Sequence, residues 1–432
     1  MLERLRETWH KRTTLFGLIL VTLVSLVGLR YLWFNSRMWF DLENLDTRVL
    51  LQTIRGEEQP FKWFVSDWPL YNGFYRPLPA LSFEIDDRLY GNNLLMYCFT
   101  NWWIGLLCSF GVVWLVWELF RNRSAAVAAG TLFAAWQGGL TDCLPIEWIG
   151  GCTALLLLTV GIFVGSGWKK GVVAAALVLL VAREASNWHD VVDVVTMDFA
   201  YRSIGWPVGR TATMATMFIL PCVAAYCRWE RGRKGKWAVV SIASLILAMM
   251  CYEQVVVVPA LLLGSAVALR VQGVQVRWFW HFLPWGMLAA YIALHSHYLP
   301  KTRYHDQAYR GINGGVRDLF SWLFPASFEI KFMPTFISPE IGIYALLIGR
   351  FWRYTAQIVS CTVSYLSFRP YWLPILYGIL ASAGAYAPMA FQQPLVHYHH
   401  LPLAFRTPFV VWLSILAWSK GREALLRPQS AS

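Results

Sequence analysis

Long apolar runs, separated by short polar segments, cover most of the chain. About twenty apolar residues in a helix span the hydrocarbon core of a bilayer. The runs lie near residues 14–34, 94–120, 124–138, 148–166, 171–186, 207–227, 237–252, 254–270, 278–295, 341–368, 371–390 and 403–418. The pattern therefore predicts an all-α polytopic membrane protein with about twelve transmembrane helices, an even number that places both termini on one side.

Two longer polar stretches interrupt this pattern, at residues 35–93 and 296–340. A connection between packed helices needs only about 2–8 residues. The first stretch contains a helix-like run at 47–54, so we expect a large first external loop with short amphipathic helices. No shift in composition marks a soluble domain, and residues 1–432 are interpreted as a single transmembrane domain.

The basic residues predict the orientation of the chain. They are concentrated before the first apolar run, in residues 228–236, and after the last apolar run at Lys420 and Arg422. Because cytoplasmic loops carry an excess of Lys and Arg, we predict cytoplasmic termini and an external first loop, in a bacterial inner membrane. The run at 13–34 is too long for a cleaved signal sequence and predicts a retained anchor.

Composition excludes several functional classes. The chain is 57% hydrophobic and 14% charged, with a mean hydropathy of +0.45, whereas soluble proteins carry about 25% charged residues. The net charge of +12 fits basic cytoplasmic loops and predicts membrane lipids, not nucleic acid, as partners. The eight cysteines form no CxxC pair, and no P-loop, GxGxxG, HExxH or GxSxG motif occurs. We therefore expect no cofactor, and a divalent cation is not indicated.

Acidic residues stand at the start of the first external loop, at Asp41, Glu43 and Asp46. A carboxylate at the membrane surface is suited to deprotonating an acceptor hydroxyl or amine as a general base. The competing interpretation is that Asp46 caps the helix-like run that follows it. The residues alone favour the cap, although catalytic and capping acids can coexist within one turn.

Two further candidates combine charge with a position at the edge of an apolar run. Arg76, in the block Phe-Tyr-Arg-Pro-Leu with Tyr75, offers a fork of donors that matches phosphate. Alternatively, it pairs with an acid of its own loop, Asp67 or Asp86. Glu253 lies between two apolar runs and is a functional candidate because an unpaired buried charge is costly. Its alternative is an external ion pair with an arginine at 183, 202 or 210.

The histidine-rich segment 397–400 precedes Arg406, which is a candidate phosphate ligand at an outer helix end. Together with the histidines at 295 and 297, this segment could suggest a metal site, but the spacing of the histidines fits metal ligation poorly and no acid lies nearby in sequence. Interfacial or substrate contacts are favoured, with His399 as the substrate-contacting candidate.

Several of these segments resemble the GT-C glycosyltransferases, in particular the protein O-mannosyltransferase-like and TMTC-like polytopic enzymes. The similar segments are DTRVLL at 46–51, GFYRPLPALSF at 73–83, LYGNN at 89–93, IGWPVGR at 204–210, MCYEQVVVVP at 250–259 and HYHHLP at 397–402. The resemblance follows the order of the family over most of the chain, although its individual motifs are short. The sequence shows none of the TPR repeats of TMTC-like enzymes.

The resemblance implies transfer of a sugar from a polyprenyl-phosphate donor to a protein or glycan acceptor on the external face, with inversion. It implies an acid of the first loop as the base, Asp46 or else Asp41. It further implies Arg76, Arg210 and Arg406 as contacts that bind phosphate or organise the loop. Glu253 and Glu147 are secondary candidates.

The sequence also departs from the family pattern. The family pairs two adjacent acids, whereas Thr47 follows Asp46 and Leu42 follows Asp41. Histidines replace a Glu-Arg pair near 397. These departures favour a second hypothesis, a catalytically inactive GT-C-like subunit of a larger membrane assembly. A transporter is a third hypothesis, disfavoured by the few charges within apolar runs and the lack of an evident two-half repeat.

Overall fold

The computed structural model describes residues 2–29, 45–59, 61–138, 201–298, 316, 319, 371–391 and 396–426. All regular structure in these segments is helical, and they contain no strand. The predicted all-α class is confirmed for the described part of the chain. The apolar runs at 148–166, 171–186 and 341–368, and the polar segment 320–340, lie outside it.

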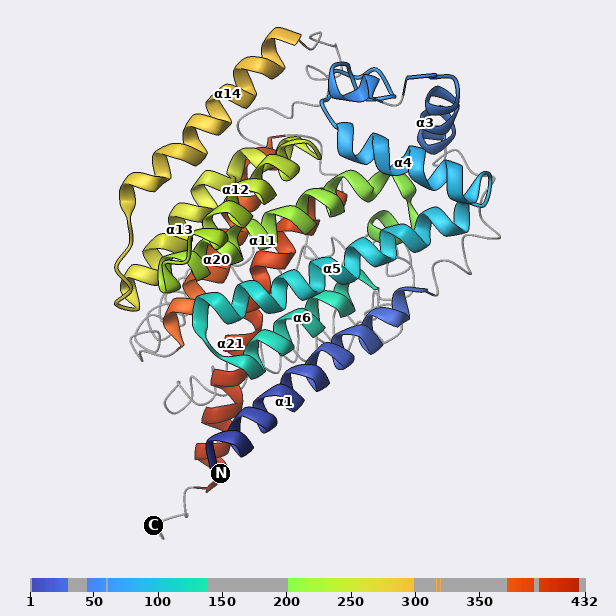
Figure 1. Ribbon diagram of the computed structural model, residues 1–432. Coiled ribbons are helices and arrows are strands. Elements are labelled where there is room, and N and C mark those ends of the chain that lie inside the picture. Colours follow the sequence, from blue (N-terminus) through green and yellow to red (C-terminus); the bar gives the residue numbers. More distant parts are fainter. Residues whose placement is uncertain are drawn as a thin grey trace, which may run out of the picture.

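The main helices overlap the predicted apolar runs (Figure 1), although α1 begins at Leu2, within the basic segment before the first run. They are α1 (Leu2–Ser25), α5 (Leu94–Phe120), α6 (Arg123–Gln137), α11 (Arg210–Gly232), α12 (Gly235–Met249), α13 (Val258–Val271), α14 (Phe282–Tyr298), α20 (Trp372–Ala390) and α21 (His400–Leu426). Short 3-10 or π turns precede several of them: η5 (Tyr201–Gly205), η6 (Pro207–Gly209), η7 (Glu253–Val257), η8 (Trp278–His281) and η9 (Val396–His399). A 3-10 turn also ends α1, η1 (Leu26–Leu29).

Within the described residues, four helical segments are long and apolar enough to cross a membrane: Leu95–Phe120, Pro207–Gly232, Glu253–Val271 and Trp372–Ala390. Shorter apolar helices occupy Thr14–Leu29, Gly235–Met249 and His400–Leu416. These lengths and compositions are those of a helical membrane protein.

The bundle is built around α5, which packs against α11 and α6. Further contacts join α1 to α6, α11 to α12, and α20 to α21, so that α5 and α6 lie near the middle of the assembly (Figure 1). Close helix approach requires small residues. A Cβ added at Gly378 of α20 would lie 2.5 Å from the backbone nitrogen of Phe409 in α21, so this crossing depends on glycine.

The described part of the first loop folds as a cap over one end of the bundle (Figure 1). It contains α3 (Leu45–Arg55), the 3-10 turn η3 (Lys62–Phe64) and α4 (Pro77–Tyr90). These elements bury a hydrophobic cluster with the start of α5 and with η6: Leu50, Leu51, Ile54, Trp63, Trp68, Ala80, Phe83, Tyr97, Trp206 and Val208. The expected short amphipathic helices are therefore present, and their apolar faces fix the cap to the bundle.

An ion pair on the outside of the cap ties α3 to α4. Arg55 Nη2 lies 2.6 Å from Asp87 Oδ1, and the Tyr97 hydroxyl donates to the same oxygen at 2.9 Å. Burial alone would raise the pKa of the Asp87 carboxyl, but the hydrogen bonds from Arg55 and Tyr97 and the charge of Arg55 lower it below the ordinary 3.8.

This pKa shift predicts how the cap responds to acid. A lowered folded-state pKa contributes stability above pH 3.8 that is lost as the pH falls through the folded-state pKa. We therefore expect the Asp87→Asn variant to be less stable than wild type near neutral pH, and the difference to shrink below about pH 4. Thermal unfolding in detergent across this pH range measures it. A difference independent of pH would contradict the proposed ion pair.

Candidate functional site

Arg76 and Glu253 meet where the cap contacts the bundle. Arg76 immediately precedes α4, whose first residue is Pro77, and Glu253 begins η7. Arg76 Nη2 lies 2.6 Å from Glu253 Oε2, and Arg76 Nε lies 3.1 Å from both carboxylate oxygens. The side chains are 10% and 23% exposed. The structure thus joins two sequence-predicted site residues that are 177 positions apart.

Aromatic rings surround the Arg76 guanidinium. Its central carbon lies 4.1 Å from the ring centre of Phe74, 4.5 Å from that of Tyr252 and 5.8 Å from that of Trp68. Stacked rings hold the planar group through cation–π attraction. Burial by itself would lower the pKa of Arg76, but the Glu253 charge raises it above the ordinary value, so the guanidinium remains charged.

The neighbouring Tyr75 is half-buried and also faces the folded loop. Its hydroxyl donates to the Phe64 carbonyl at 3.2 Å, and burial raises its pKa. The hydroxyl is therefore protonated at neutral pH and serves as a hydrogen-bond donor. A second backbone link, from Leu78 N–H to the Met250 carbonyl at 3.2 Å, fixes the same loop against the 250–254 segment.

A third chain segment reaches this site through Gln254. Its Nε2 donates to the backbone carbonyls of Ala385 at 3.0 Å and Tyr398 at 3.1 Å. The Tyr252 and Tyr398 rings lie 6.3 Å apart, and the half-buried His399 ring packs at 5.1 Å against Tyr386. The predicted site residues Arg76, Tyr75, Glu253 and His399 therefore lie on three segments that converge at one end of the bundle.

Arg210 has a different environment. Its side chain is fully buried, with Nη2 2.6 Å from Asp86 Oδ2 and 2.9 Å from the Tyr97 carbonyl. Its Nε donates to Asn101 Oδ1 at 2.7 Å, and the Phe83 ring lies 4.2 Å away. Arg210 joins α11, α4 and α5, which is a loop-organising contact. The sequence had offered Asp86 as a partner for Arg76, and Arg210 as a partner for Glu253. Both alternatives are wrong, because Asp86 and Arg210 pair with each other.

Asp67, the other acid that the sequence offered as a partner for Arg76, has a different role. Its two carboxylate oxygens each accept a backbone N–H at 2.9 Å, one from Gly73 and one from Phe74. Gly73 has a φ of 79°, a conformation that glycine adopts without strain. Asp67 therefore shapes the turn that presents Arg76 and does not pair with it.

Arg406 is fully buried between α21 and α20. Its Nη1 lies 3.2 Å from Ser382 Oγ, and its guanidinium lies 4.6 Å from the Phe409 ring centre. Nearby on α21, His400 Nε2 lies 3.0 Å from Gln137 Oε1 of α6. The structure places Arg406 within the helix packing, away from any exposed outer helix end.

Asp46 is exposed in the first turn of α3. The helix begins at Leu45, so Asp46 lies within its first turn. There its charge is favoured by the helix dipole. Leu50 of α3 and Trp68, whose ring centre lies 5.8 Å from the Arg76 guanidinium, belong to the same buried cluster of the cap. Asp41 and Glu147 lie outside the described residues.

The described residues contain no group of three or more His, Cys, Asp or Glu that would hold a metal ion. The sequence identified Arg76 and Glu253 separately but missed their pairing, as well as the Asp86–Arg210 pair. The signal in the sequence was the external side of the membrane that the basic loops predict for both members of each pair, since only residues on the same side can meet. Comparison of the chain with protein-family models, curated proteins and solved structures finds no match.

Proposed function

We propose that the chain is a membrane glycosyltransferase that takes a sugar from a polyprenyl-phosphate donor and transfers it to a protein or glycan acceptor. The Arg76–Glu253 pair supports this proposal most strongly. It holds a charged guanidinium among aromatic rings at the junction of the cap and the bundle. Such a group suits a lipid-linked phosphate that enters from the membrane surface.

In the proposed reaction an acid of the first loop, Asp46 or Asp41, takes the proton from the acceptor hydroxyl. The acceptor oxygen attacks the anomeric carbon from the opposite side, and the bond to the phosphate oxygen breaks. Polyprenyl phosphate leaves with the electron pair, and Arg76 stabilises its added negative charge. The ion pair uses Arg76 Nε and Nη2, so Nη1 is the nitrogen assigned to a phosphate oxygen.

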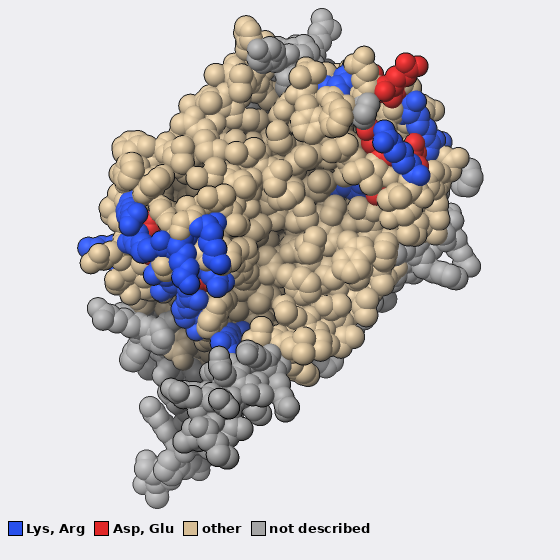
Figure 2. Space-filling view, in the orientation of Figure 1, with Lys and Arg blue, Asp and Glu red and all other residues tan. Residues whose placement is uncertain are grey.

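The proposed topology extends the observed helices to about twelve transmembrane segments in all, in a bacterial inner membrane. Both termini are then cytoplasmic and the cap is external. The basic ends of α5 and α11 lie opposite the cap, as this orientation requires (Figure 2).

A second candidate function is a GT-C-like structural subunit without activity. The observation that favours it is the environment of Arg210, whose guanidinium is fully buried and engaged by Asp86, Asn101 and Tyr97. Such a residue organises the fold and leaves no access for a substrate phosphate. A structural subunit would purify in a stable complex in mild detergent and would not consume lipid-linked sugar.

We expect Arg76→Gln to raise the KM for the lipid donor about tenfold or more, since charge-assisted phosphate contacts contribute about 1.5–3 kcal/mol. It also leaves the Glu253 carboxylate partly buried without its counter-charge, so the melting temperature should fall. The measurement is the initial rate of radiolabelled sugar transfer in proteoliposomes as a function of donor concentration.

The matched control is Arg88→Gln, which removes an arginine from α4 whose side chain is 73% exposed. It should leave both KM and melting temperature near wild type. The Glu253→Gln variant, which retains the guanidinium, should lose stability with a smaller change in KM. An Arg76→Gln variant that folds and has an unchanged KM would contradict the phosphate role of Arg76.

A further inference from the structure

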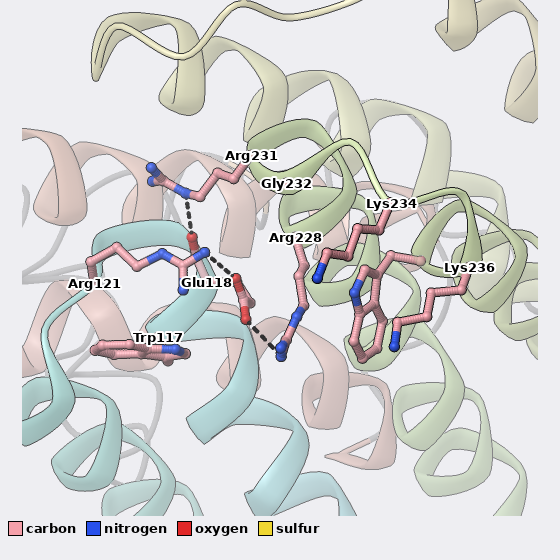
Figure 3. A pocket seen from close by; sticks show the side chains of 9 residues that line it. Trp117, Glu118, Arg121, Arg228, Arg231, Gly232, Lys234 and Lys236 are labelled. Atoms are coloured by element: carbon pink, nitrogen blue, oxygen red, sulfur yellow. Dashed lines mark hydrogen bonds and ion pairs between the residues drawn. The ribbon is translucent and has the colours of Figure 1, made fainter. Parts of the chain in front are cut away.

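A second polar site lies at the end of the bundle opposite the cap. It is a cavity of about 370 Å³ between the end of α5 and the α11–α12 turn. Its walls are Trp117, Glu118, Arg121, Arg228, Arg231, Gly232, Lys234, Lys236 and Trp237 (Figure 3). Lys and Arg side chains gather at this place on the surface (Figure 2). The volume falls within the range of about 300–1,000 Å³ typical of ligand pockets.

The charges of the cavity walls do not balance. Five cations face one carboxylate, Glu118, whose side chain is fully buried. Glu118 is already engaged, because Oε2 lies 2.5 Å from Arg121 Nη2 and Oε1 lies 3.4 Å from Arg228 Nη1. The Trp114 indole also donates to Oε1 at 3.3 Å. The cavity therefore has a strong positive potential, which favours an anion of more than one negative charge.

Two tryptophans preorganise the cations. The Arg228 guanidinium lies 4.3 Å from the Trp237 ring centre, and Lys236 Nζ lies 5.3 Å from it. On the opposite wall Arg121 lies 5.4 Å from the Trp117 ring centre. Stacking fixes the direction of these side chains, so less conformational entropy is lost when they bind a ligand.

Helix ends of both signs lie around the cavity, because α5 and α11 end there and α12 begins there. Arg231 donates to the carbonyls of Glu118 at 2.9 Å and Leu119 at 2.8 Å, which neutralises the negative end of α5. The 15-residue helix α12 begins at the cavity, and its N-cap residue Lys234 makes no side-chain capping hydrogen bond. The positive end of the α12 dipole is thus directed to the same place as the cations.

We propose that this cavity binds the phosphate of an anionic phospholipid headgroup. It lies at the ends of two candidate spans, Leu95–Phe120 and Pro207–Gly232, which is the depth of the headgroups. Tryptophan is the residue preferred at that depth. A surplus of cations alone would serve to orient the helices. A hollow with stacked arginines and a helix N-terminus is in addition a phosphate-binding site.

The test is native mass spectrometry of the full-length protein in detergent, titrated with phosphatidylglycerol or phosphatidylcholine. We expect tighter binding of phosphatidylglycerol, and a loss of roughly tenfold to a hundredfold in its affinity for the triple variant Arg228→Gln/Lys234→Gln/Lys236→Gln. All three side chains are exposed, and Glu118 keeps Arg121 as its partner, so the variant should still fold, which its melting temperature checks. The matched control is Arg270→Gln, an exposed arginine near the same end of the bundle that does not line the cavity.

Competition with inorganic phosphate and glycerol 3-phosphate identifies the source of the phosphate. Weak competition supports the lipid headgroup, whereas displacement of the lipid at equal concentration supports a site for soluble phosphates. The proposal is overturned if the folded triple variant retains phosphatidylglycerol as well as wild type does, or if Arg270→Gln loses as much affinity. It is also overturned if phosphatidylcholine binds equally well.

Discussion

The Asp46→Asn variant is expected to lose sugar transfer by about 100-fold or more, since general bases contribute about 10²–10⁴ in rate. Asparagine has the size of aspartate, but its amide is too weak a base to take the proton from the acceptor hydroxyl. Asp46 is exposed in the first turn of α3, so its replacement opens no cavity in the cap. The loss of its interaction with the helix dipole costs only about 0.3–1 kcal/mol. Initial transfer rates from a polyprenyl-phosphate sugar, with the melting temperature alongside, measure both effects.

The control for this variant is Glu58→Gln, which neutralises another exposed acid of the same loop. It should leave transfer unchanged. Because Asp41 is the second candidate for the base, Asp41→Asn and the double variant belong to the same series. If both single variants and the double variant retain full transfer, neither Asp41 nor Asp46 is the base.

The largest loss of stability is expected at the Asp86–Arg210 pair, whose side chains are 5% and 0% exposed. Arg210→Gln leaves the Asp86 carboxylate buried without its counter-charge, which costs about 3–5 kcal/mol. Asn101 and Ser82 also lose a donor, since Arg210 bonds to both. The free energy of unfolding in mild detergent, measured by denaturant titration, should fall accordingly.

Two comparisons test this assignment. The double variant Asp86→Asn/Arg210→Gln should lose less stability than the sum of its single variants, because each single variant leaves an isolated buried charge and the double variant leaves none. The exposed pair one residue along α4 supplies the control: Arg55→Gln, whose side chain is 40% exposed, should cost at most about 1 kcal/mol. Additive losses at 86 and 210 would show that the two side chains do not interact.

The helices were predictable from sequence because their signal is local. An apolar run of the length of the bilayer leaves its backbone no alternative to helix. Residues 94–120 are therefore predicted and observed as one helix with the same ends. The short helices of the cap were predictable for a related reason, since α3 places its apolar residues on one face.

The charge pairs were not predictable, because pairing depends on which segments the fold brings together. Arg76 had acids available within its own loop, at 67 and 86, yet its partner is Glu253. Asp67 instead accepts the amides of a turn, and Asp86 reaches Arg210. Sequence periodicity places charges on a face of the membrane, but the choice among partners there is made by tertiary packing.

The basic pocket illustrates the same distinction. The cations of residues 228–236 were predicted to orient the chain, and their abundance is explained by that role. The hollow arises only because α5 ends beside the α11–α12 turn, which brings Trp117 and Trp237 into one lining. No property of either segment alone reports the cavity.

The most direct measurement is consumption of radiolabelled polyprenyl-phosphate hexoses by proteoliposomes that contain the full-length protein, with membranes of the source organism as the supply of acceptor. We predict that wild type releases polyprenyl phosphate and labels an acceptor, and that the Asp41→Asn/Asp46→Asn double variant does neither. If wild-type protein that is folded and free of partner subunits consumes no donor across the panel of sugars, the chain is not a glycosyltransferase, and the structural-subunit function takes its place.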